Sequence, residues 1–148
     1  MKLLLLFMTA ILLTGCEMGM DGDQQARAAA EAWADAYFNC DFKDASGYVT
    51  QESQKWLQYA ASNTTEQDLK LLQDAGGAHV TVSEGFDVAN DTLRVVTLSV
   101  NNFLTPAAQR QTSALAKEAT FKVTVVKREA GWQVRMEGLP QNGMQSHD

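Results

Sequence analysis

The sequence predicts an α+β fold in which N-terminal helices pack on one face of an antiparallel sheet of three or four strands. The first half of the chain carries apolar residues at helical spacing, up to a glycine pair at residues 76–77. Beyond that pair, apolar and polar residues alternate with period two, which is typical of half-buried strands. Helices that precede all the strands favour this class over an alternating parallel α/β fold.

Helical segments account for the first half of the chain. Residues 24–38 form an alanine-rich first helix with Asp23 as its expected N-cap. Asp41 caps a short second helix, and a third segment covers residues 50–60. The fourth helix begins at Thr65 and stops at the glycine pair, because glycine accepts the left-handed conformation at a helix end.

Strands follow the glycine pair. Residues 79–83, 92–100, 119–127 and 132–137 are the expected strands. The second of them carries apolar residues on both faces, which favours a central position in the sheet. Each strand is followed by a turn or a polar segment, so the pattern predicts an antiparallel meander.

The segment 101–116 lacks a clear period. Pro106 suits the first position of a short helix, and a long hairpin loop is the alternative. The last eight residues, 141–148, are polar and are expected to be flexible.

Composition excludes several classes of function. The formal net charge is −6, which disfavours binding to nucleic acid or to anionic lipid. Of the two cysteines and two histidines, Cys16 ends the N-terminal signal described below and His147 lies in the tail. The remaining Cys40 and His79 are too few for a Cys/His zinc site, and we expect no metal and no cofactor. No Gly-x-Ser-x-Gly, phosphate-binding loop or dinucleotide fingerprint is present, so no catalytic residue is assigned.

The first sixteen residues have the pattern of a secretory signal. Lys2 precedes an apolar run that is too short to span a bilayer, and small residues precede Cys16. The ending Leu-Thr-Gly-Cys resembles the lipobox of bacterial lipoproteins, which implies cleavage before Cys16 and acylation of its thiol by membrane lipid. The alternatives are an ordinary secretory peptide with an incidental cysteine, or an uncleaved anchor.

This interpretation divides the chain into four parts. They are a signal peptide (1–15), a lipidated tether (16–23), one domain (24–140) and a flexible tail (141–148). The tether extends to at most about 25 Å, so the domain is expected close to its membrane. Because the residue after the cysteine is Glu17 and not aspartate, the lipoprotein resemblance implies the outer membrane, facing the periplasm.

Residues 24–138 resemble the NTF2-like (cystatin-like α+β) superfamily, and within it small lipoproteins of unassigned function. The matching segments are Ala-Ala-Ala-Glu-Ala-Trp-Ala-Asp-Ala-Tyr (28–37), Asp-Phe-Lys-Asp-Ala (41–45), Tyr-Val-Thr-Gln-Glu-Ser (48–53) and Gly-Trp-Gln-Val (131–134). The resemblance implies a cone in which a curved sheet and the first helix enclose a cavity. Cys40 departs from the family, where glycine is common.

Five side chains are candidates for lining a ligand pocket in this cone: Trp33, Tyr37, Tyr48, Trp56 and His79. Aromatic residues at helical spacing can equally belong to the core. His79 lies on the polar side of its expected strand. It faces either the cavity, where it could act as an acid or base, or water. Two carboxylates have simpler roles, because Asp35 lies on a solvated helix face and Asp41 is a cap.

The leading hypothesis is a non-enzymatic envelope lipoprotein that binds a partner protein or a small apolar ligand. The alternative is a small hydrolase, isomerase or dehydratase with its acid/base group in the cone. A third hypothesis is a subunit of an envelope assembly, and the fold resemblance also implies a possible homodimer through the sheet.

Overall fold

A computed structural model describes residues 21–105 and 114–140, excepting the side chains of residues 84–89. The elements follow the order α1 (Gly22–Phe38), α2 (Phe42–Ala45), η1 (Ser46–Tyr48), η2 (Gln51–Ser53), α3 (Gln54–Ser62), α4 (Glu66–Asp74), β1 (His79–Asn90), β2 (Leu93–Leu104), β3 (Leu115–Arg128) and β4 (Gly131–Arg135). Helices therefore precede a four-stranded sheet, and the predicted α+β class is confirmed. The segment 106–113, for which a helix or a loop was expected, and the tail 141–148 lie outside the described residues.

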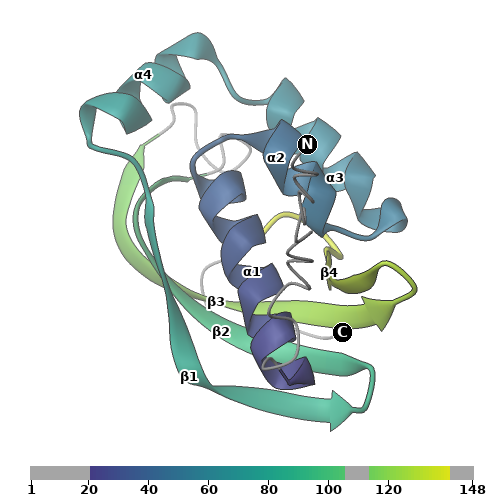
Figure 1. Ribbon diagram of the computed structural model, residues 1–148. Coiled ribbons are helices and arrows are strands. Elements are labelled where there is room, and N and C mark those ends of the chain that lie inside the picture. Colours follow the sequence, from purple (N-terminus) through teal and green to yellow (C-terminus); the bar gives the residue numbers. More distant parts are fainter. Residues whose placement is uncertain (1–20, 106–113, 141–148) are drawn as a thin grey trace, which may run out of the picture.

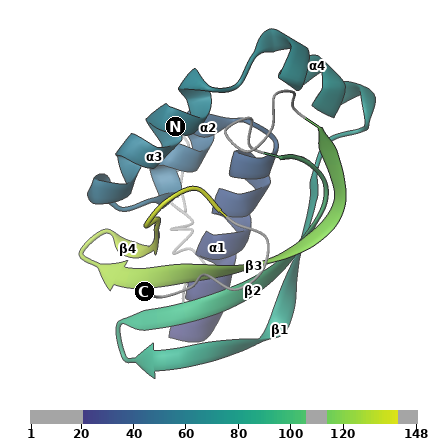
Figure 2. The same cartoon turned by 180° about the vertical axis from the view of Figure 1, so that it is seen from behind.

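The sheet is an antiparallel meander in the order β1-β2-β3-β4. It curves, and α1 lies across its concave face while α2, α3 and α4 continue along one end (Figures 1 and 2). The central position predicted for the second strand is confirmed, because β2 pairs with β1 on one side and β3 on the other. Within the described residues, no helix is long and apolar enough to cross a membrane.

The N-cap of α1 is Asp21, and the prediction of Asp23 was wrong by two residues. Asp21 Oδ1 accepts a hydrogen bond from the Gln24 backbone N–H at 2.8 Å, as an N-cap carboxylate does. Asp23 instead lies in the first turn, where its carboxylate receives the Nε–H of Arg94 from β2 at 2.8 Å. This ion pair fixes the beginning of α1 against the sheet.

The shorter helices begin at the capping residues that the sequence predicted. Asp41 Oδ1 accepts the backbone N–H of Asp44 at 3.1 Å, at the start of α2. Thr65 and Asp68 form a reciprocal capping box at the start of α4, with distances of 2.9 and 3.1 Å. The glycine pair after α4 has φ angles of 87° and 82°, so it ends the helix in the left-handed conformation.

The predicted third helix begins later than expected, at Gln54, after the 3-10 turn η2. The cause is a buried polar link between this turn and the end of β4. The backbone N–H of Thr50 bonds to Val134 O at 3.0 Å, and the two buried hydroxyls of Thr50 and Ser53 lie 2.7 Å apart. Ser53 Oγ also accepts the backbone N–H of Met136 at 2.8 Å. These bonds replace helical ones and hold η2 against β4.

The core lies between α1 and the concave face of the sheet. Alternation along β3 buries Phe121, Val123 and Val125 on the concave side, as predicted from the period of two. The central strand contributes Val96, Leu98 and Val100, each with no exposed surface. The first helix closes the core from the other side, mainly with alanines and with Trp33 and Phe38.

Candidate functional site

Two of the five predicted pocket residues meet on α1. The Trp33 and Tyr37 rings stack with centroids 5.1 Å apart, because residues four apart lie on one helix face. Trp33 is only 2% exposed, and it also meets the edge of Phe38. Burial, with a smaller effect from Cys40, raises the pKa of the Tyr37 hydroxyl well above its ordinary value. Tyr37 is therefore protonated at neutral pH and is not poised to act as a base.

The other three predicted residues lie elsewhere. Tyr48 and Trp56 are half-buried and pack against the core from η1 and α3. The Lys55 ammonium lies 5.3 Å from the centre of the Trp56 ring, which is a cation–π distance. His79 is exposed at the beginning of β1, so it meets water. The joint ligand pocket of these five residues stays a prediction.

Aromatic side chains fill the space between α1 and the concave face of the sheet. Phe38 contacts Phe103 and Phe121 with ring centroids 5.6 and 4.8 Å apart, and the last two rings are 5.4 Å apart. Beside this cluster, a cavity of about 20 Å³ is lined by Trp33, Arg135 and neighbouring residues of β3 and β4. That volume suits about one water molecule, whereas pockets for small molecules usually measure about 300 Å³ or more.

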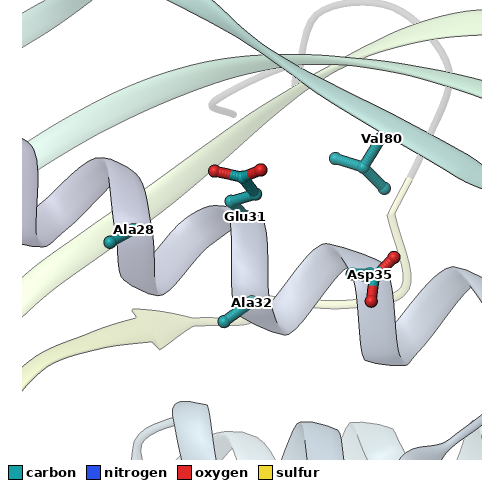
Figure 3. Close-up of a pocket in the computed structure, with 5 residues that line it drawn as sticks. All are labelled: Ala28, Glu31, Ala32, Asp35 and Val80. Carbon is teal, nitrogen blue, oxygen red and sulfur yellow. The ribbon is translucent and has the colours of Figure 1, made fainter.

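A larger groove of about 360 Å³ lies between α1 and the first part of β1. Its lining residues are Ala28, Glu31, Ala32, Asp35 and Val80, drawn in Figure 3. Both carboxylates are exposed, and neither has an ion pair within the described ranges. The groove therefore combines negative charge with small apolar contacts.

A second groove, of about 370 Å³, separates the end of α1 from α4. Leu69 and Leu72 of α4 line it together with Asn39, whose side chain bonds to both the N–H and the C=O of Ala78. Leu69 is 44% exposed and the neighbouring Leu71 is 38% exposed. The fourth helix thus presents apolar surface that the rest of the described chain does not cover.

Cys40 ends α1 in a strained conformation. It has a φ of 61°, and the bonds from Cys40 N to Tyr37 O (3.0 Å) and from Asp41 N to Ala36 O (2.9 Å) form a Schellman motif. Glycine is favoured at this position, since a left-handed non-glycine residue costs about 1–2 kcal/mol. Cys40 is a free, half-buried thiol, and burial with help from Asp68 raises its pKa to about 11.

The raised pKa predicts slow alkylation of Cys40. In a Cys16→Ser chain, reaction with iodoacetamide at pH 8 should be about a hundredfold slower than for a thiol of pKa 9.0, because the thiolate is the nucleophile. The rate, followed by mass spectrometry, should rise until about pH 11. Because folding raises the pKa of the Cys40 thiol, the free energy of unfolding should also fall as pH rises above the pKa that this thiol has in the unfolded chain.

Unfolding in urea supplies the control for this measurement. In the unfolded chain, the alkylation rate of Cys40 should depend on pH as it does for a free cysteine. An inflection near pH 9 in the folded chain would contradict the assignment. The thiol would then be as accessible and as acidic as a free cysteine.

The other candidate titratable groups in the described part of the chain have structural roles or face solvent. Asp35 is exposed and Asp41 acts as a cap, as the sequence predicted. Within residues 21–105 and 114–140, no three His, Cys, Asp or Glu side chains lie close enough together to hold a metal ion. Glu31 shares the exposed face of α1 with Asp35, and this face borders β1, which helical spacing alone does not reveal.

Comparisons with known proteins give shape similarities alone. No protein-family model matches the sequence, and no curated protein matches it. One similar solved structure is described as an NTF2-like protein involved in plasmid conjugation, with 18% identity, a TM-score of 0.43 and coverage of 86% of this chain. The chain spans about half of that protein's length, 52%. Another is the intermembrane space region of the chloroplast protein ARC6, with 16% identity, a TM-score of 0.48 and coverage of 84% and 98% of the two chains.

Proposed function

We propose that this chain is a lipid-anchored envelope lipoprotein whose NTF2-like domain binds a partner protein close to the outer membrane. The observation that carries the proposal is the signal that ends in Leu-Thr-Gly-Cys at Cys16. The folded domain begins soon afterwards, since α1 starts at Gly22. The few residues between them extend to at most about 20 Å, so any partner must also lie near the membrane.

The filled interior supports a partner protein over a small apolar ligand. Trp33, Phe38 and Phe121 occupy the space that a ligand would need in the cone. The enzymatic alternative lacks support from its histidine, because His79 is exposed and its environment is solvent. Grooves on the surface, in contrast, are large enough to receive segments of another protein.

Replacing Cys16 by serine is expected to abolish lipidation and anchoring. Without the thiol, no diacylglycerol can attach, and the chain should leave the membrane fraction of a bacterial host. Intact mass spectrometry should show the loss of the acyl mass, and fractionation should show the redistribution.

The matched control for this substitution is Cys40→Ser, which removes the other thiol of the chain and should leave both measurements unchanged. The lipoprotein proposal is wrong if the Cys16→Ser chain keeps its acyl mass and still sediments with membranes.

A further inference from the structure

Among the described residues, the first strand pairs on one side only. Its register runs from His79 opposite Asn101 to Val82 opposite Leu98, so its described backbone partners all lie in β2. The register then shifts between Val82 and Phe86, and pairing with β2 resumes at Phe86 opposite Val96, so an irregularity divides β1 into two parts. The Arg27 guanidinium covers this point by donating to Ser83 O at 3.1 Å. The first part of the edge is therefore residues 79–82.

This short edge borders the acidic groove. Val80 lies on the groove side of β1, and α1 runs alongside the first half of the strand in both views (Figures 1 and 2). The carboxylates of Glu31 and Asp35 lie on the part of α1 that lines the same groove (Figure 3). Four residues of helix rise by about 6 Å, close to the about 6.6 Å between alternate residues of a strand.

We propose that residues 79–82 and the α1 carboxylates form a docking site for an extended segment of a partner protein with Lys or Arg at alternate positions. The segment adds to the free edge of β1, and main-chain hydrogen bonds provide affinity. Its basic side chains point towards Glu31 and Asp35, while Ala28 and Ala32 leave room for their stems. The inference rests on the proposed partner-binding function and specifies its surface.

Charge argues for a basic partner over a second copy of this chain. Antiparallel pairing of two β1 edges would bring two α1 helices to the same side, each with Glu31 and Asp35 exposed. Like charges placed across an interface are unfavourable and suppress the wrong partner. The whole chain is also acidic, with a formal net charge of −6, which favours encounter with basic segments.

A defined peptide tests the site directly. A ten-residue peptide of alternating lysine and threonine should bind the purified mature chain in detergent micelles, with an affinity that falls as salt is raised. Methylating the backbone nitrogens of one alternate set of residues should abolish binding, and methylating the other set should leave it. Only strand addition gives this difference, because successive N–H groups point to opposite sides. Equal effects of the two methylated peptides would overturn the proposal.

Charge removal tests the acidic side of the groove. The double substitution Glu31→Gln and Asp35→Asn should weaken peptide binding by about three- to tenfold, the sum expected for two exposed ion pairs. A control with Glu66→Gln and Glu129→Gln removes the same charge from α4 and the β3–β4 turn, and should leave binding unchanged. Equal losses in both variants would mean that net charge alone attracts the peptide, and the proposed site would be wrong.

Photocrosslinking in intact cells separates this inference from the proposed function. A crosslinker at Thr81, exposed on β1, should yield an adduct whose attached peptide has Lys or Arg at alternate positions. A crosslinker at Glu129 serves as the control. Adducts from Glu129 alone would refute the docking site and leave partner binding intact, whereas none from either position would refute partner binding itself. A dimer of this chain captured through Thr81 would refute the choice of occupant.

Discussion

Replacing Trp33 by alanine is expected to lower the free energy of unfolding by about 3–5 kcal/mol, the cost of removing a large aromatic side chain from a packed core. Trp33 is 2% exposed and contacts both Tyr37 and Phe38, so its removal leaves a cavity that the neighbouring rings cannot fill. Urea denaturation followed by circular dichroism measures this loss. The effect is large enough to unfold a domain of ordinary stability at physiological temperature.

Two further substitutions show what Trp33 does. Trp33→Phe keeps most of the ring contacts and removes Nε1, which has no hydrogen-bond partner in the described part of the chain, so it should cost far less. Trp56→Ala, at a half-buried position, should also cost less than Trp33→Ala. If Trp33→Ala leaves stability unchanged, the residue lines a pocket and the interpretation of a filled cone is wrong.

Ser53→Ala is expected to destabilise the fold by about 2–3 kcal/mol, a large effect for the loss of one oxygen atom. Ser53 is fully buried, and its hydroxyl accepts the Met136 N–H at 2.8 Å and lies 2.7 Å from Thr50 Oγ1. The substitution leaves a buried N–H without an acceptor, which costs its full desolvation energy. Thermal denaturation monitored by circular dichroism would reveal the loss as a lower Tm.

Ser62→Ala provides the matched comparison for this effect. Ser62 is exposed and donates to Gln58 O within α3, so its loss should change stability by less than about 0.5 kcal/mol. Equal effects of the two substitutions would show that the link between η2 and β4 contributes nothing special to the fold.

Local chemistry explains why much of the fold could be predicted from the sequence. The caps at Asp41 and Thr65 depend on residues three positions away, and the strand alternation around Phe121 depends on a period of two. The N-cap of α1 was misplaced because Asp21 and Asp23 are both good caps, and their roles are set by Arg94, a residue far along the chain.

The candidate site was harder to predict, because its parts meet only through the curvature of the sheet. The period of α1 correctly indicated that Asp35 lies on an exposed face, which Glu31 shares. That this face borders the edge of β1 depends on how the strands bend around the helix, which no local pattern encodes. The same applies to Ser53, whose partner Met136 lies 83 residues further along the chain.

The contact between Arg94 and the first turn of α1 has a mechanical consequence under the proposed anchoring. Arg94 bonds Asp23 at 2.8 Å, and its guanidinium lies 5.3 Å from the centre of the Trp132 ring on β4. Tension on the proposed anchor would enter the domain at Gly22, beside this contact. The force would pass through Arg94 into β2, whose hydrogen bonds to β1 and β3 would distribute it. The beginning of α1 would therefore resist separation from the sheet.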